Sequence, residues 1–288
     1  MTAGQWAKRK RLAAAATMVI VLLLGTIVGL TVEQSITTGK RSAAQALAFT
    51  HAQRMVQHLE DAMAPAYMLA ALVQQGHGKV DNFDAVAEQL LQNFPMARAI
   101  QLAPGGVIRQ TYPLHGNEKA VGHDLLRDRE RNREAHVALA TRQLTVAGPF
   151  NLVQGGVGAV GRYPVFIVDQ TGRESFWGFT TVLVRVPELL NTAGILDLSR
   201  EGYRYELCRV PPSSHECEVF ARSGEGPLEA PVIVPVDVPN GHWQLALAPE
   251  NGWISRTERL QLVMALVLVA VLLGGLQYLF LRQLQRAA

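Results

Sequence analysis

The 288-residue sequence has few of the residues and motifs on which metal binding and common catalytic mechanisms depend. It contains two cysteines, too few for a paired set of C-x-x-C zinc ligands, and it contains neither H-E-x-x-H nor G-x-S-x-G. His115, His123 and His136 lack the close spacing typical of metal ligands, so we interpret them as surface or hydrogen-bonding residues. We therefore expect no catalytic residue, no metal site and no cofactor, and an exported enzyme is the least favoured function.

Charge is also missing from two long apolar runs, one near each end of the sequence. Residues 12–32 and 263–281 contain no acidic or basic side chain. A helix rises about 1.5 Å per residue, so each run is long enough to cross a hydrocarbon core of about 30 Å. A cleaved signal peptide would have a shorter apolar core and a small-residue exit, which 30–33 does not offer. We expect transmembrane helices at 12–32 and 260–281, and thus a protein of the bacterial cytoplasmic membrane.

Basic residues beside these runs predict the orientation. Lys8–Arg11 precede the first run, and Arg282 and Arg286 follow the second, so the positive-inside rule places both tails in the cytoplasm. Arg256 and Arg259 flank the other end of the second run and oppose this only weakly, because long translocated domains largely escape the rule. We therefore expect the central domain to be periplasmic or extracellular. The pI near 9.0 comes from the basic tails, so we expect no nucleic-acid partner.

The two cysteines, Cys208 and Cys217, flank a polar turn that contains Pro-Pro-Ser-Ser. In an oxidising compartment they would close a hairpin and stabilise it by about 2–3 kcal/mol. We expect this disulfide because the topology exports the segment, and the alternative is a pair of free thiols.

After the first apolar run, the sequence 33–80 has the pattern of a stalk helix with an apolar stripe. Pro65 is expected to kink or interrupt this helix, because proline removes a backbone donor and clashes with the preceding turn. The stripe must pack either on the chain's own domain or on the same helix of a second copy, and the pattern leaves both open. Its members are Ile36, Ala43, Leu47, Met55, Leu59 and Met63.

The rest of the exported segment divides into two parts. In the first part, 81–194, Asp81 is expected to cap a helix that ends at Phe94, and the elements follow in the order β-β-α-β-β-β. We expect an α+β, PAS-like antiparallel sheet that has helices over one face and encloses a small pocket. The second part, 195–258, is shorter and β-rich, and we expect a membrane-proximal domain. The strands of the first part are expected at 97–103, 107–111, 144–153, 158–168 and 176–186, with the helix at 127–143.

The segment Gly156–Gly161 matches G-x-G-x-x-G, the dinucleotide-binding fingerprint. In a Rossmann unit this segment is followed by a helix whose N-terminus holds the pyrophosphate. Here 162–166 contains a proline and has a strand-like pattern, so we reject dinucleotide binding.

A set of short motifs occurs in a fixed order between Phe94 and Gly202. They are Ile108–Pro113, Gly116–Glu118, Ala120–Leu126, Gly148–Phe150, Gln154–Gly156, Arg162–Phe166 and Phe176–Phe179. Together they resemble the CHASE domain, the extracytoplasmic sensory module of receptor histidine kinases and diguanylate cyclases, including plant cytokinin receptors. The resemblance implies a long stalk helix, tandem PAS-like domains, dimerisation and ligand capture in the membrane-distal domain.

The resemblance also implies a ligand site. Asp124 falls on the position of a ligand-binding aspartate of the cytokinin receptors, and Val146 matches an apolar pocket wall. Residues 162–164 and 176–178 follow the bacterial pattern, which argues against a purine-type ligand. The alternatives are a helix cap for Asp124, an intradomain ion pair for Arg162 and core packing for the aromatic residues. The full expected set is Asp124, Val146, Phe150, Arg162, Tyr163, Phe166, Trp177 and Phe179.

We therefore expect a transmembrane sensor whose exported domain binds a small molecule and moves the two membrane helices relative to each other. The tails, 1–11 and 282–288, hold no output domain, so we expect a cytoplasmic output domain or partner of the histidine kinase or diguanylate cyclase type outside this sequence. The sequence leaves open whether the chain is a fragment, a split receptor or a relic without output. The other expected partners are the ligand, the membrane and a second copy of the chain. An alternative class is a membrane-anchored binding or assembly protein without signalling output.

Overall fold

The chain folds into two compact units. Gln45–Ala248 forms the central unit, and Met1–Ala44 together with Pro249–Ala288 forms the terminal unit. The structure, a computed structural model, describes residues 3–129, 131–153, 155–210 and 217–287. Within these ranges the side chains on which the expected orientation rests are not among those described; they belong to Lys8, Arg9, Lys10, Arg11, Arg282 and Arg286.

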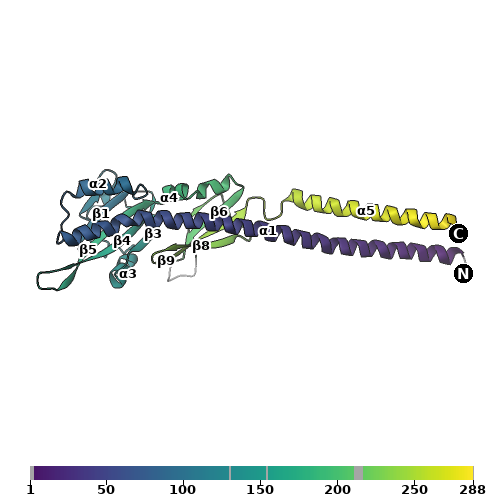
Figure 1. Cartoon of the computed structure of the whole chain (residues 1–288), viewed down its shortest axis with the longest axis horizontal. Helices are drawn as coiled ribbons and strands as arrows, with labels where there is room; N and C mark the ends of the chain where they lie inside the picture. Colours follow the sequence, from purple (N-terminus) through teal and green to yellow (C-terminus); the bar gives the residue numbers. More distant parts are fainter. Residues whose placement is uncertain (1–2, 130, 154, 211–216, 288) are drawn as a thin grey trace. The chain divides into compact units, whose positions relative to one another are not determined.

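Two long apolar helices make up the terminal unit (Figure 1). Helix α1 (Ala3–Gln75) runs on into the central unit, and α5 (Arg256–Ala287) is the last element of the chain. Both are long and apolar enough to cross a membrane. Large apolar side chains along them, such as Leu24 and Leu272, are exposed, which is unfavourable in water but suits lipid hydrocarbon. The helices therefore have the length and composition of membrane anchors.

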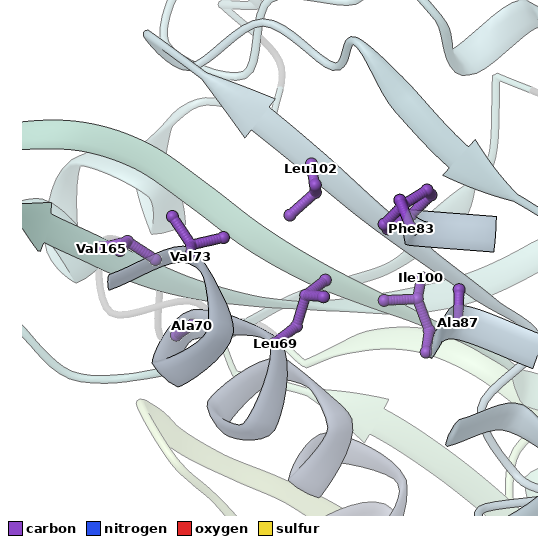
Figure 2. Packing of buried hydrophobic residues seen from close by; sticks show 8 residues of the cluster. All are labelled: Leu69, Ala70, Val73, Phe83, Ala87, Ile100, Leu102 and Val165. Atoms are coloured by element: carbon purple, nitrogen blue, oxygen red, sulfur yellow. The ribbon is translucent and has the colours of Figure 1, made fainter. Parts of the chain in front are cut away.

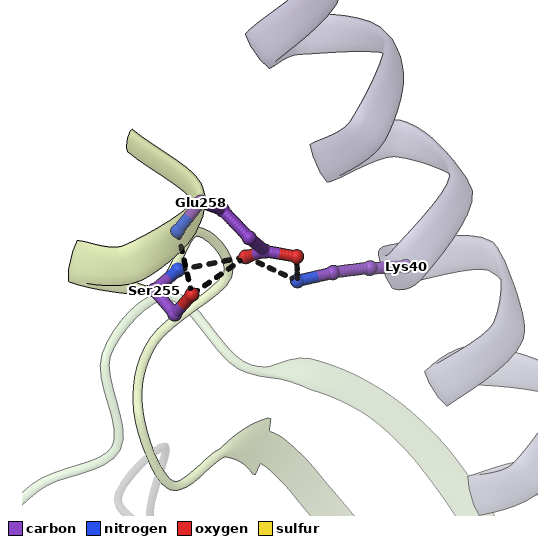
Figure 3. A network of polar contacts seen from close by, with 3 residues as sticks. All are labelled: Lys40, Ser255 and Glu258. Carbon is purple, nitrogen blue, oxygen red and sulfur yellow. Dashed lines mark hydrogen bonds and ion pairs between the residues drawn. The ribbon is translucent and has the colours of Figure 1, made fainter. Parts of the chain in front are cut away.

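Polar contacts tie the first turn of α5 to α1 (Figure 3). The Ser255 amide donates to Glu258 Oε2 at 2.9 Å, and the Glu258 amide donates to Ser255 Oγ at 3.2 Å, which is a reciprocal capping box. Lys40 of α1 donates to both carboxylate oxygens of Glu258, at 2.7 and 2.8 Å. A second ion pair joins Arg259 to Glu33 at 3.4 Å. These contacts determine which turn of α1 meets the start of α5.

The first sheet of the central unit has five antiparallel strands in the order β2-β1-β5-β4-β3. They are β1 (Ala99–Pro104), β2 (Gln110–Tyr112), β3 (Thr145–Asn151), β4 (Val157–Val168) and β5 (Glu174–Arg185). Helix α2 (Phe83–Asn93) contacts β1 and β2, a short 3₁₀ turn η1 (Glu118–Ala120) follows β2, and α3 (Arg133–Thr141) contacts β3 and β4. The strands at 144–153, 158–168 and 176–186 are thus confirmed.

Helices α1 and α2 cover one face of the first sheet (Figure 2). Leu69 and Val73 of α1 and Phe83 of α2 meet Ile100 and Leu102 of β1 in one buried cluster. Because side chains alternate along a strand, Ile100 and Leu102 share this face and the residue between them points to the other. The sheet therefore has a second face that α1 does not occupy.

Half of the residues in the expected apolar stripe of α1 are buried within the central unit. Met55, Leu59 and Met63 are at most 2% exposed. At Gly161 of β4 a Cβ atom would lie 2.0 Å from Met63 Sδ, so glycine lets the helix approach the strand. Pro65 lies inside α1, which continues past it, so the expected interruption does not occur. Burial of the surrounding helix against the sheet outweighs the cost of the proline.

The second sheet of the central unit has four strands in the order β7-β6-β9-β8. They are β6 (Tyr203–Arg209), β7 (Glu218–Arg222), β8 (Val232–Val238) and β9 (Gly241–Pro249), preceded by α4 (Val186–Thr192) and the 3₁₀ turn η2 (Ile195–Ser199). Val232, Val234 and Val236 alternate with exposed residues along β8, as expected for a strand with one buried face. The structure joins Cys208 to Cys217 in a disulfide.

One side chain of the second sheet binds the edge of the first. Asn240, in the turn between β8 and β9, accepts a hydrogen bond from the Val146 amide at 2.7 Å and donates one to the Val146 carbonyl at 3.2 Å. Val146 lies in β3, which is an edge strand of the first sheet. The amide of Asn240 thus pairs with β3 as a neighbouring strand would.

The fold class is α+β with a long N-terminal helix and two antiparallel sheets, as expected. Two helices begin later than the sequence indicated. Helix α2 begins at Phe83 with Asn82 as its N-cap residue and without a side-chain capping bond, so Asp81 is not the cap. Helix α3 begins at Arg133, not at 127, and Arg127, Arg129 and Arg131 lie in turns.

Candidate ligand-binding site

A small cavity of about 30 Å³ lies on the second face of the first sheet, between the strands and the loop that precedes α3. Its polar lining consists of Gln101, His123, Arg131 and Arg162, and the remaining lining residues are apolar. A few convergent polar groups in an apolar wall are the usual form of a small-molecule site.

Arg162 of β4 is a buried cation with an unused donor. It is 2% exposed, and its Nη1 donates to the Arg131 carbonyl at 2.5 Å. Its Nε has no hydrogen-bond partner among the residues that the structure describes. Burial lowers the pKa of Arg162 to about 10, although the nearby carboxylates of Glu134 and Asp128 act in the opposite direction. The guanidinium therefore stays protonated at neutral pH, and its Nε lacks an acceptor among the described residues.

The loop before α3 brings a second arginine and a histidine to the cavity. Asp128 lies between them, 3.2 Å from His123 Nε2 and 3.6 Å from Arg131 Nη1. The Arg131 guanidinium stands 5.3 Å above the ring of Phe150. Burial lowers the pKa of His123 more than Asp128 raises it, so this ring is neutral at pH 7. The charged residues that line the cavity are then the two arginines, so the cavity favours an anion.

A chain of buried side chains holds Gln101 of β1 in place. Thr181 donates its hydroxyl to Gln101 Oε1 at 2.7 Å, and Gln101 Nε2 lies 3.4 Å from Thr111 Oγ1. All three residues are at most 5% exposed. Fixed amide groups of this kind give a site directional specificity.

Among the residues expected to bind ligand, Arg162 and Phe150 line this cavity. Asp124 is not part of its lining. Asp124 Oδ1 accepts hydrogen bonds from the amides of Leu126 at 3.0 Å and Arg127 at 3.2 Å. Asp124 therefore caps a local turn, which corresponds to the capping alternative, although the capped element is not α3.

Three of the other expected residues lie outside the cavity. Val146 lines a separate cleft of about 200 Å³ between the two sheets. Tyr163 is on the opposite face of the first sheet, where its ring centroid is 4.7 Å from that of Tyr67 in α1. Trp177 packs against the buried cluster on that same face.

The last two expected residues belong to an aromatic group in the core. The rings of Phe166 and Phe179 each contact Phe176, at centroid distances of 5.7 and 5.1 Å. Phe179 is fully buried in a cluster with residues of α3 and of the preceding loop. This arrangement matches the core-packing alternative for Phe179.

Strand geometry explains why expected site residues that are adjacent in the sequence lie on opposite faces of the sheet. Arg162 and Tyr163 are adjacent in β4 and therefore point to opposite faces. The pairing of β4 with β5 shifts between Val165 and Phe166, so an extra residue of β5 is accommodated there. Gly178 fits this irregularity because a Cβ would lie 2.2 Å from the Ala103 carbonyl oxygen.

Gln101, His123 and Arg131 line the cavity but were not predicted from the sequence to bind ligand. Gln101 had a signal, because it is the one polar residue of the strand Ala99–Pro104. His123 and Arg131 lie in a loop, and no periodicity in the sequence predicts which way loop side chains point.

A family model matches part of the central unit. Residues 84–207 match the family model of the CHASE domain. This range includes the whole first sheet and its cavity. The chain therefore contains a CHASE domain, and the resemblance seen in the sequence is confirmed. Two long apolar helices flank this sensor-type domain, which indicates membrane anchoring.

Solved structures of bacterial sensor domains share the fold. An extracellular ligand binding receptor from Desulfohalobium retbaense is 19% identical with a TM-score of 0.54, over 70% of this chain and 39% of its own. The ligand-binding domain of the Pseudomonas aeruginosa amino acid chemoreceptor PctC is 16% identical with a TM-score of 0.51, over 72% of this chain and 98% of its own. The sensory domain of the Campylobacter jejuni chemoreceptor Tlp3 is 11% identical with a TM-score of 0.50, over 76% of this chain and 97% of its own.

These likenesses establish the fold, with two antiparallel sheets that resemble tandem PAS-like sensor domains. This chain spans 39% of the length of the Desulfohalobium receptor. No curated protein matches the chain.

Proposed function

We propose that this chain is a membrane-anchored sensor whose CHASE domain binds a small carboxylate-bearing molecule at the cavity beside Arg162. The observation that supports the proposal is the buried guanidinium of Arg162, whose Nε has no acceptor among the described residues. A buried donor without an acceptor is unfavourable, and a carboxylate would supply the acceptor that Nε lacks together with a negative charge. The second arginine of the lining, Arg131, adds to the attraction for an anion.

An amino acid fits the remaining polar groups. Gln101 Oε1 accepts one hydrogen bond from Thr181 and has a second lone pair for a ligand ammonium group. PctC, which shares the fold, was solved in complex with GABA, an amino acid. At 16% identity the likeness concerns the fold alone, so the ligand class for this chain rests on the charges around the cavity.

Ligand binding requires the cavity to enlarge. A volume of about 30 Å³ holds about two water molecules and is too small for an amino acid. The loop with His123 and Arg131 belongs to no strand of the sheet and is joined to it by one isolated bridge, between Val107 and Asp124, so we expect this loop to move outward. A ligand that binds the enlarged form more tightly than the closed one shifts the equilibrium between them, which is the elementary step of a sensor.

The signal would pass to the cytoplasm through the two apolar helices. In this proposal both tails are cytoplasmic and the CHASE domain is periplasmic or extracellular, as the basic flanks of the helices indicate. The output would come from a separate protein or domain of the histidine kinase or diguanylate cyclase type. The proposal also divides the exported segment into a membrane-distal part, 81–194, and a membrane-proximal part, 195–258.

We also propose that the sensor is a parallel homodimer along α1. The last residues of the expected stripe, Met55, Leu59 and Met63, are buried within the chain and are not available for contact with a second copy. Phe49, Tyr67 and Met68 lie on the exposed side of α1, and each is between 44% and 53% exposed. The same side of a second α1 would bury them.

The test is calorimetric titration of the full chain, held in lipid nanodiscs, against a panel of amino acids and short carboxylic acids. A hydrogen bond to a charged group contributes about 1.5–3 kcal/mol, so Arg162→Gln should weaken binding about 10- to 150-fold. Arg142→Gln is the matched control, because Arg142 is an exposed arginine of the same domain, paired with Glu174. A ligand that binds the Arg162→Gln variant as tightly as the parent protein would refute the site.

A further inference from the structure

The terminal unit contains an apolar groove of about 830 Å³ between α1 and α5. The two helices approach each other at Gly25 and Gly29, where Cβ atoms would lie 3.5 and 3.0 Å from the Leu266 side chain. This pair of glycines is therefore used for contact within the chain. The groove runs along the same faces of the helices, and Val21 of α1 and Gly274 of α5 are among its lining residues.

Gln277 is a polar side chain within this groove. It lies in the uncharged run 263–281, and it lines the groove. Its amide makes no hydrogen bond to any residue that the structure describes. Thr26, another polar lining residue, donates its hydroxyl to the Leu22 carbonyl at 2.8 Å and is satisfied. In hydrocarbon an unpaired amide is unfavourable, because no water is present to bond it.

We infer that α5 of a second copy of this chain occupies the groove, with the two Gln277 amides bonded to each other across a two-fold axis. An amide carries both a donor and an acceptor, so two copies related by symmetry satisfy one another. A lipid chain would fill the space but would leave the amide unpaired. No heavy atom lies within 4 Å of a Cβ built at Gly274, so a neighbouring backbone has room to approach there.

This inference rests on the membrane-spanning role of α1 and α5 and does not depend on the ligand site. Titration of ligand reports on the cavity beside Arg162, and self-association of the parent chain reports on the proposed homodimer, whereas a loss of self-association in Gln277→Leu reports on the groove. The proposed ligand site can therefore be refuted while the inference about the groove holds, and the reverse is also true.

The first test is cross-linking of the full chain in phospholipid vesicles. Cys208 and Cys217 are already bonded to each other, so a single introduced cysteine supplies the reactive thiol. Gly274→Cys should give a covalent dimer under mild oxidation. Leu272→Cys, at an exposed position that does not line the groove, should give much less. Equal cross-linking at both positions would overturn the inference.

The second test replaces the amide. Gln277→Leu should weaken dimerisation in the vesicles about 3- to 30-fold, which is the range for interhelical hydrogen bonds between membrane helices. Gln261→Leu is the matched control, because Gln261 is an exposed glutamine of α5 outside the groove. An unchanged dimer in Gln277→Leu would contradict the inference. Strong quenching by brominated lipid of a fluorophore at position 274, with no covalent dimer in Gly274→Cys, would identify lipid as the occupant instead.

Discussion

The two sheets of the central unit differ in what they bury. The first sheet and its surroundings bury polar groups, including Gln101, Thr181 and Arg162. The buried residues of the second sheet that the structure describes are apolar or the disulfide-bonded Cys208, apart from the hydroxyl-bearing Tyr205. Because buried polar groups reduce stability unless they are paired, their concentration in one sheet indicates a site, whereas the second sheet has the composition of a structural core.

The largest expected effect tests the second sheet as a structural core. Leu245 of β9 is fully buried, so Leu245→Ala should lower the free energy of unfolding by about 2–5 kcal/mol. Ile233→Ala, at an exposed position of the neighbouring β8, is the control and should change little. Urea unfolding followed by circular dichroism measures both. If ligand affinity fell in Leu245→Ala protein that is still folded, the second sheet would have a part in binding.

Removal of the disulfide should have the next largest effect. Cys208 and Cys217 are separated by nine positions in the sequence, and a loop of this size contributes about 2–3 kcal/mol through the entropy of the unfolded chain. The Cys208→Ser/Cys217→Ser variant should lose that stability and retain the parent ligand affinity. Full thiol labelling of the native, non-reduced protein would show instead that the bond does not form.

Replacement of the buried arginine should separate stability from binding. Apolar replacement of buried charges is often neutral or stabilising, so Arg162→Met should raise the free energy of unfolding by about 1–3 kcal/mol while ligand binding is lost. Arg142→Met, at an exposed ion pair, should change stability by less than about 1 kcal/mol. A strongly destabilised Arg162→Met variant would mean that Arg162 supports the fold of the first sheet.

The smallest effect concerns Asp124. Because Asp124 Oδ1 caps a turn, Asp124→Asn should leave both stability and ligand affinity nearly unchanged. Asp124→Ala should lower stability by about 1 kcal/mol, the usual cost of a lost cap. The family resemblance implies a different result for Asp124→Asn, namely binding weakened about tenfold by loss of a charged hydrogen bond. Titration of a confirmed ligand distinguishes the two.

The fold could be predicted because the sequence patterns that indicate its elements are local or periodic. Uncharged runs longer than a membrane is thick mark α1 and α5, and period-two alternation marks long strands such as β4 and β5. An ordered set of motifs identified the CHASE domain without any contact information. The ends of helices were less predictable, because the capping side chains of α2 and α3 make no capping bonds.

The site was only partly predictable because it depends on register and on a loop. Arg162 was found, but its neighbour Tyr163 was assigned to the same pocket although alternation sends it to the other face. The shift in strand pairing near Val165 changes which residues of β5 at 174–177 share a face with Arg162, and no local pattern reveals it. Arg131 reaches the cavity from a loop that is held by a local ion pair with Asp128 and by the tertiary hydrogen bond from Arg162 to the Arg131 carbonyl.

The hydrogen bonds of Asn240 also protect the protein from self-association of its sheets. An edge strand with free N–H and C=O groups is a template for a strand of another molecule. The side chain of Asn240 occupies both backbone groups of Val146, so β3 is capped at this point by its own chain. Loss of Asn240 would leave that part of the edge open, and the first consequence would be strand exchange between copies and aggregation of the exported domain.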